Sequence, residues 1–204
     1  MNIKKHIVLA KELFYDLFEE TGGQGYRYNH SLVCLDIAKK VRRKIKTKGI
    51  DWEIVYLGCL FHDIGKSIKS QNKIAVDKNH NDLSIEELQN TFGKLLPPEK
   101  IKILKQIIFE HSIENPKLVE SLIVRDCDMA SKFGVSEIWR LFNFSGQTKR
   151  NAFDTIKDYY EYVVPKREKM LKKFYFLEIK EIALKRLKEE KTMVKKFQNQ
   201  FCLE

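Results

Sequence analysis

The chain has 204 residues, of which 43% are hydrophobic, and its formal net charge is +10. This length suits one domain, and the hydrophobic content is enough for a packed core. With only 9 Gly and 4 Pro, the chain has too few turn residues for a β-sandwich, so long helices are favoured. The four cysteines form no C-x-x-C pair, which excludes a zinc knuckle and fits a reducing cytoplasm.

The sequence predicts neither a signal peptide nor a membrane partner. The first apolar stretch, Ile7 to Ala10, is interrupted by Lys11. The apolar run from Val55 to Phe61 is far below the ~18 residues that a membrane span needs. We therefore expect a cytoplasmic protein. Lysines are interleaved with Glu and no Arg-rich block stands out, so nucleic acid is a less expected partner than a small anion.

The hydrophobic pattern predicts helices along most of the chain. Residues 2–20 form an amphipathic stretch that ends at the Gly-rich segment 21–25, the strongest helix breaker in the sequence. A second helix is predicted to begin near Asn29, a plausible cap. Asp51 can cap a third helix, 52–64, which is apolar on nearly all sides and therefore belongs in the centre of a domain.

The middle of the chain continues this pattern. Polar residues 68–82 predict a loop, and Ser84 and Glu87 then have the spacing of a capping box that begins a short helix. Further helices are predicted at 98–112, 116–133 and 136–142, followed by a loop over 144–148.

The pattern changes after residue 150. Two long, highly charged amphipathic helices are predicted from Asn151 onward, divided near Pro165 or Leu177. We expect an all-α chain in which residues 1–150 form the core and residues 151–204 form helices that pack on it. The alternative is that these helices pair with another copy of the chain, as in a homodimer.

His62 and Asp63 lie at the end of the most apolar predicted helix. Burying a bare carboxylate or a charged imidazole is costly, and a metal ion is one of the few partners that satisfies both groups. Adjacent residues on a helix point about 100° apart, so both side chains can reach one ion beside the helix end. For the dipeptide alone, a surface pair or a His–Asp hydrogen bond remains an equal alternative.

Two further candidate ligands lie far from this pair in the sequence. His30 is near the start of the second predicted helix, and Asp128 is inside the apolar helix 116–133. Helical proteins build metal sites from separate helices that each offer one or two ligands to a shared interior. Imidazole and carboxylate ligands suit a divalent metal. We favour Mn²⁺, with Mg²⁺, Fe²⁺, Ni²⁺, Co²⁺ and Zn²⁺ as alternatives.

Four segments in this order resemble the HD superfamily of metal-dependent phosphohydrolases: His30-Ser-Leu, Phe61-His62-Asp63-Ile64-Gly65-Lys66, His111-Ser112 and Asp126-Cys127-Asp128. The resemblance covers about residues 26 to 135. It implies an HD-domain helical bundle with a C-terminal helical extension. It also implies that the metal ligands are His30, His62, Asp63 and Asp128.

A looser similarity concerns the C-terminal part. The C-terminal part is similar to that of small bacterial single-domain HD hydrolases at Tyr159-Tyr160, Lys166, Lys169-Met170-Leu171, Ala183, Arg186 and Phe197. Some members of that subgroup split nucleoside triphosphates and release pyrophosphate. The resemblance therefore implies a nucleotide substrate, cleaved to a monophosphate and pyrophosphate, or another small phosphate ester.

Periodicity does not decide between Asp126 and Asp128 as the last ligand. The two residues point to nearly opposite faces of a helix that is apolar on both sides. Similarity to the family's Ala-Asp-x-Leu-like segment places the ligand at Asp128. The alternative role for Asp126 is a salt bridge with Arg125 or a nearby Lys.

His80 and His111 raise the question of a second metal. Two-metal members of the superfamily carry two more His residues between the His-Asp pair and the final Asp, and these two have the right order. Two metals would clamp a phosphate from both sides. The simpler interpretation makes His80 a surface residue and His111 a hydrogen-bond donor to the substrate.

Three residues are predicted to act on the phosphate. A bound metal lowers the pKa of its water, and Asp63 can be both a ligand and the group that orients this water. Lys66, directly after the predicted helix end, can hold a phosphate as a point charge. Arg27, three residues before His30, can also meet phosphate. Surface roles are the alternatives for Lys66 and Arg27.

Two other functions remain open. HD domains also act as nucleases or phosphodiesterases, on nucleic acid or on cyclic nucleotides, although the Gly-Tyr-Pro segment expected for cyclic dinucleotides is absent. A non-enzymatic helical scaffold with a structural metal is the second alternative.

Overall fold

The computed structural model of the chain describes residues 3–15, 18–19, 23–66 and 80–200. In chain order the helices are α1 (Ile3–Phe14), α2 (Tyr26–Val41), α3 (Trp52–Phe61), α5 (His80–Phe92), α6 (Pro98–Glu110), α7 (Val119–Ser131), α8 (Val135–Gln147), α9 (Ala152–Asp158), α10 (Val164–Leu171) and α11 (Leu177–Gln200), with a π-helical segment η2 (Tyr159–Val163) before α10. Strands β1 (Phe18–Glu19) and β2 (Gly23–Gln24) pair antiparallel. The predicted all-α fold class is confirmed.

Helix α3 lies at the centre of the bundle, where it packs against α2, α6 and α7. Every residue from Ile54 to Phe61 is buried, as the continuous apolar pattern predicts. Asp51 caps the helix and accepts hydrogen bonds from the N–H groups of Glu53 and Ile54 at 3.0 and 3.3 Å. This fixed and buried helix carries His62 at its C-cap.

Gly58 allows α3 to approach its neighbours closely. A Cβ at this position would lie 2.8 Å from Cγ2 of Val124 in α7 and 3.0 Å from Cγ2 of Ile107 in α6. These distances are shorter than van der Waals contacts between carbon atoms. The glycine therefore sets the spacing between the helices that carry His62 and Asp128.

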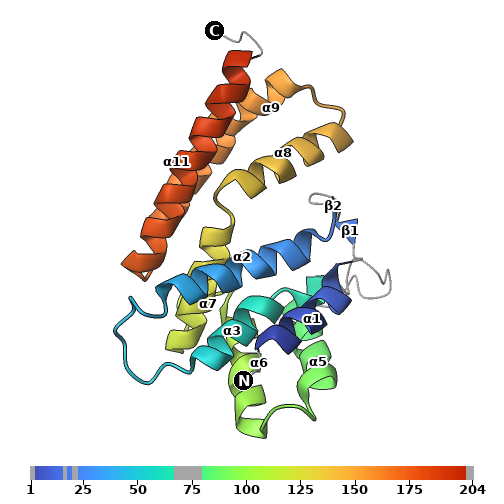
Figure 1. Cartoon of the computed structure of the whole chain (residues 1–204), viewed down its shortest axis with the longest axis vertical. Coiled ribbons are helices and arrows are strands. Elements are labelled where there is room, and N and C mark those ends of the chain that lie inside the picture. Colours follow the sequence, from blue (N-terminus) through green and yellow to red (C-terminus); the bar gives the residue numbers. More distant parts are fainter. Residues whose placement is uncertain (1–2, 16–17, 20–22, 67–79, 201–204) are drawn as a thin grey trace.

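The C-terminal helices form the opposite end of the molecule from α1, α5 and α6 (Figure 1). Helix α11 packs against α7 and α8. A second apolar cluster joins α8 to the C-terminal helices and consists of Ile138, Ile156, Tyr159, Val164 and Val194. A division of the chain near residue 150 stays a prediction.

Two predicted helix boundaries near the N-terminus were wrong. The first helix ends at Phe14 rather than at residue 20, because residues 18–19 pair with residues 23–24 in a short hairpin. Helix α2 begins at Tyr26 rather than near Asn29, after Gly25 with a φ of 70°. Glycine adopts this left-handed conformation without strain, so the chain turns sharply into α2.

Three other boundaries also differ from the prediction. Helix α5 begins at His80, so Ser84 lies within the helix and does not cap it. The Ser84 hydroxyl instead accepts a hydrogen bond from the N–H of Gly65 at 2.8 Å and donates one to the carbonyl oxygen of His62 at 3.4 Å. Helix α8 continues to Gln147, through most of the predicted loop 144–148, and α7 begins at Val119 rather than at residue 116.

None of the helices in the described part of the chain is long and apolar enough to cross a membrane.

Candidate metal centre

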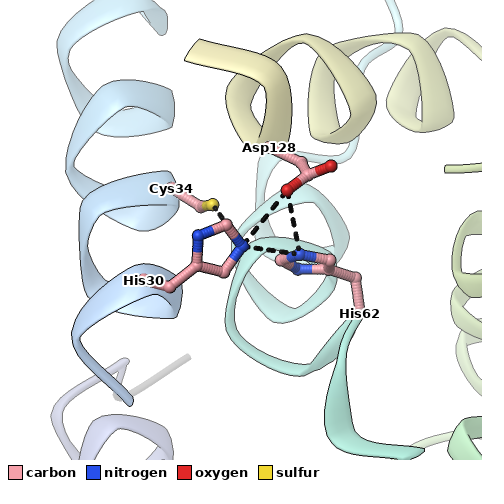
Figure 2. A group of neighbouring side chains, drawn as sticks. All are labelled: His30, Cys34, His62 and Asp128. Carbon is pink, nitrogen blue, oxygen red and sulfur yellow. Dashed lines mark hydrogen bonds and ion pairs between the residues drawn. The ribbon is translucent and has the colours of Figure 1, made fainter. Parts of the chain in front are cut away.

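Side chains from α2, α7 and the end of α3 converge on one point in the core (Figure 2). His30 Nε2 lies 3.2 Å from His62 Nε2 and 3.1 Å from Oδ1 of Asp128. His62 Nε2 lies 3.5 Å from the same carboxylate oxygen. All three residues are at most 8% exposed. The structure thus brings together three of the four predicted metal ligands as one buried cluster.

The donor atoms have the spacing expected around a single cation. Two ligands about 2.1 Å from one ion lie about 3.0 Å apart at a right angle and about 3.4 Å apart in a tetrahedron. The distances of 3.1 and 3.2 Å in this cluster fall in that range, and the third, 3.5 Å, exceeds it by about 0.1 Å. The residues present therefore fit a divalent metal.

In both His30 and His62, the ring nitrogen that points away from the cluster, Nδ1, faces an oxygen atom that can accept a hydrogen bond. Ser131 Oγ donates a hydrogen bond to the carbonyl oxygen of Asp128 at 2.7 Å, so it accepts one from Nδ1 of His30 at 3.0 Å. Nδ1 of His62 faces the carbonyl oxygen of Cys59 at 3.2 Å. Rings held in this way direct Nε2 toward the cluster. Two imidazole nitrogens and a carboxylate oxygen this close together suit a shared cation.

Asp63 lies beside this cluster and is paired with two cations. Its Oδ2 is 3.9 Å from Nε2 of His30 and 3.8 Å from Nε2 of His62. Arg27 contacts the same oxygen at 2.7 Å, and Lys66 contacts Oδ1 at 2.6 Å. The structure therefore places Asp63, Arg27 and Lys66 at the site, with both basic side chains on the aspartate.

Burial and charge set the protonation states in the cluster. Burial lowers the pKa of His30 below its ordinary value, although Asp128 opposes this shift. Burial would raise the pKa of Asp63 and of Asp128, but neighbouring charges hold both well below the ordinary range. These charges are His62, Lys66 and Arg27 for Asp63, and chiefly Lys132 for Asp128. Ionised carboxylates beside a neutral His30 are the forms that bind a metal.

His111, at the C-cap of α6, also faces the cluster. Its Nε2 is 3.8 Å from Oδ1 of Asp63, and its ring centroid is 5.1 Å from that of His62. Burial and the charge of His62 lower its pKa to about 4. His80 begins α5, but its side chain lies outside the described residues. A second metal between these two histidines therefore stays a prediction.

Asp126 points away from the cluster. Its Oδ2 accepts hydrogen bonds from the N–H groups of Tyr175 and Phe176, each at 2.8 Å. The carboxylate thus joins α7 to the segment before α11. Of the two aspartates that periodicity could not separate, Asp128 is the one beside His30 and His62. The predicted salt bridge of Asp126 with Arg125 or a lysine is not found among the described residues.

Sequence reasoning missed three residues of the cluster. Cys34 Sγ lies 3.8 Å from Nε2 of His30, within a group of four residues whose donor atoms are all within 4.8 Å of one another. Lys132 contacts Oδ2 of Asp128 at 2.7 Å, and Ser131 orients His30. Spacing could have shown two of them, because Cys34 follows His30 and Lys132 follows Asp128 by one helical turn.

A cavity of about 440 Å³ lies beside Arg27, Lys66 and Lys132. We call it the tyrosine cavity, because Tyr26 and Tyr162 line it. Its other lining residues are Glu137, Arg140, Val163, Lys166, Arg167 and Met170. Of the residues that the structure describes, six cationic residues and one carboxylate therefore face a space whose volume is typical of small-ligand sites.

A family model describes residues 27–131 as an HD domain. The chain belongs to the HD-domain family. This assignment covers about half of the sequence and includes His30, His62, Asp63 and Asp128. HD domains bind divalent metal, and the protein is an HD-superfamily hydrolase. No curated protein matches the sequence significantly.

Solved structures share the fold over nearly the whole length. The Lin1889 protein from Listeria innocua is 21% identical, with a TM-score of 0.64, over 100% of this chain and 99% of its own. Bacillus subtilis YpgQ, solved in complex with ADP, is 16% identical with a TM-score of 0.65, over 97% and 96%. An HD-superfamily hydrolase from Bacillus thuringiensis is 16% identical with a TM-score of 0.66, over 99% and 97%.

Proposed function

We propose that this HD hydrolase cleaves nucleoside triphosphates to nucleoside monophosphates and pyrophosphate. The observation that carries the proposal is the position of the tyrosine cavity next to the metal cluster. Three of its lining residues also contact the aspartates of the site: Arg27 and Lys66 contact Asp63, and Lys132 contacts Asp128. A nucleotide has an aromatic base and a chain of phosphates. Tyrosine rings suit the base, and clustered Lys and Arg side chains suit the phosphates.

The metal would be held by His30, His62 and Asp128, with Asp63 beside them. A divalent cation there polarises a phosphoryl oxygen and makes a nearby water more acidic. Mn²⁺ is our preferred ion, because imidazole and carboxylate ligands suit it. YpgQ in complex with ADP shows that a protein with this fold accommodates a nucleotide, which supports the proposed substrate class.

Arg27 and Lys66 would contact both Asp63 and the phosphates of the substrate. Arg27 and Lys66 neutralise Asp63 and also line the tyrosine cavity. With a divalent cation bound beside Asp63, Arg27 and Lys66 would also contact the phosphate oxygens of a substrate in this cavity. Asp63 can then orient the water that attacks phosphorus.

The reaction can be tested by product analysis. We expect the purified protein with Mn²⁺ to convert each triphosphate and one water into equal amounts of monophosphate and pyrophosphate. Reaction in ¹⁸O-labelled water should put the label on the monophosphate, because attack at the α-phosphorus breaks the bond between that atom and the bridging oxygen to the β-phosphorus. Release of orthophosphate would contradict this site of cleavage. Absence of turnover of any triphosphate would contradict the proposed substrate.

Substitutions in the site should lower turnover, whereas a substitution outside it should not. Asp128→Asn should lower turnover by at least about 100-fold, because a ligand to a catalytic cation is lost. Lys66→Met should lower it about 10–100-fold, since one phosphate contact is worth a few kcal/mol. Lys102→Met, an exposed change on α6, is the matched control and should act like the wild type. Faster cleavage of single-stranded RNA or DNA than of nucleotides would instead favour a nuclease.

A further inference from the structure

Arg125 is a buried cation with an unused donor. It lies on α7 and is only 8% exposed, yet its Nη1 has no hydrogen-bond partner. In the described ranges, no carboxylate forms an ion pair with it. A buried charge is costly unless a partner compensates for it. The charge of Arg125 acts on the neighbouring Asp126, but its unpaired Nη1 can still donate a hydrogen bond to a bound anion.

The guanidinium lines a cavity of about 500 Å³ that also reaches the metal cluster. We call this space the Arg125 cavity. The other described residues around it are Lys66, His111, Ser112, Ile113, Glu114, Asp128, Met129, Lys132 and Lys173. Lys66 and Lys132 line the tyrosine cavity as well. The two cavities thus meet at the lysines that contact Asp63 and Asp128.

A second basic side chain, Lys173, also lines this cavity, and hydrogen bonds fix the chain segment that carries it. Asp126, the neighbour of Arg125, accepts hydrogen bonds from the N–H groups of Tyr175 and Phe176. These bonds fix the segment between α10 and α11, which carries Lys173. Two adjacent residues of α7 therefore act together, because Asp126 anchors the segment while Arg125 lines the cavity with Lys173.

The balance of charge in the Arg125 cavity favours an anion. Lys66 and Lys132 are paired with Asp63 and Asp128, which leaves Arg125 and Lys173 opposite the exposed Glu114. In contrast to the tyrosine cavity, its lining contains no aromatic residue other than His111 among the residues that the structure describes. A small and highly charged anion fits these surroundings better than a nucleoside.

We propose that the Arg125 cavity is a subsite for the pyrophosphate product, held by Arg125 and Lys173, while the nucleoside part occupies the tyrosine cavity. This assignment rests on the proposed nucleotide hydrolysis. A triphosphate lying across Lys66 and Lys132 would place its α-phosphorus near the metal cluster. The two products would then lie on opposite sides of the bond that breaks.

Direct binding of each product tests this division. Equilibrium dialysis of the Mn²⁺-loaded protein, in buffer with excess Mn²⁺, measures the affinity for labelled inorganic pyrophosphate and separately for labelled AMP. Arg125→Gln and Lys173→Gln should each weaken pyrophosphate binding about tenfold or more, because a charge-assisted contact is lost. AMP binding should stay within about twofold, because such contacts act locally.

A variant of the other cavity provides the matched control. Arg140→Gln removes a cation that lines the tyrosine cavity, so it should weaken AMP binding and leave pyrophosphate binding unchanged. Lys173 is exposed, so its variant tests the subsite even if Arg125→Gln fails to fold. Unchanged pyrophosphate affinity in Lys173→Gln and in any folded Arg125→Gln would overturn the subsite, as would an equal loss for AMP and pyrophosphate.

The outcome for the subsite is separate from the outcome for the reaction. If the protein splits no nucleotide but binds pyrophosphate through Arg125 and Lys173, the anion site stands and the proposed reaction fails. If it splits triphosphates while both variants bind pyrophosphate like the wild type, the reaction stands and the subsite is overturned.

Discussion

Ser131 and His30 are 101 residues apart in the sequence, and their side chains meet in a 3.0 Å hydrogen bond. The serine hydroxyl donates to the carbonyl oxygen of Asp128, so it fixes the His30 ring with Nε2 toward the cluster. One hydroxyl thus links the orientation of a ligand from α2 to the helix that supplies Asp128.

Ser131→Ala should therefore weaken metal binding without unfolding the protein. We expect the dissociation constant for Mn²⁺ to rise about 10–100-fold, the usual effect of losing a group that orients a ligand. Calorimetric titration measures this change. Ser145→Ala, which changes a buried serine on α8, is the matched control. Equal Mn²⁺ affinities for the two variants would disprove the orienting role of Ser131.

Asp126→Asn should leave Mn²⁺ affinity unchanged, because Asp126 binds the backbone before α11 and does not face the cluster. We also predict that this variant changes how the free energy of unfolding depends on pH. Burial raises the pKa of Asp126 to about 6, so the stability that this shift contributes is present at low pH and is lost as the pH rises through about 6.

The asparagine cannot ionise and avoids that loss. Between about pH 4 and about pH 7.5, the metal-free variant should gain up to about 3 kcal/mol in unfolding free energy relative to the wild type. Urea unfolding at several pH values measures this difference. A constant difference across the range would show that Asp126 does not titrate as expected.

Gly58→Ala should destabilise the protein by about 1–3 kcal/mol, because its Cβ would press against Val124 and Ile107. Gly146, on α8, has no atom within 4 Å of an added Cβ, so Gly146→Ala should cost nothing or stabilise by up to about 1 kcal/mol. Urea unfolding of both variants checks the contrast. Equal free energies of unfolding for the two variants would show that the close approach of α3 to α6 and α7 at Gly58 is not required for stability.

Local patterns in the sequence predicted much of the fold. The apolar segment before His62 and the Asp51 cap were sufficient to predict α3 and its central position. The hairpin after α1 and the start of α2 at Tyr26 were not predicted, because pairing over two residues leaves no periodic signal. Ser84 has a capping-box spacing, but tertiary hydrogen bonds to residues 62 and 65 take its hydroxyl.

The candidate site could be predicted only in part. Order and residue type indicated His30, His62, Asp63 and Asp128, and family resemblance preferred Asp128 over Asp126. Sequence could not show which face of α7 meets α3, since the helix is buried on both sides. It also could not show that Arg125 lines a cavity, because this depends on packing between α7 and the distant segment around Lys173.

The central claim is that α2, α3 and α7 hold one divalent cation between them. Titration of the metal-free protein with Mn²⁺ tests it directly, on the wild type, His62→Gln and a His6→Gln control, in which the changed residue is on α1. We expect one ion per chain in the wild type and the control, and an affinity at least about 100-fold weaker in His62→Gln. Wild-type affinity in His62→Gln, or no bound Mn²⁺ in the wild type, would contradict it.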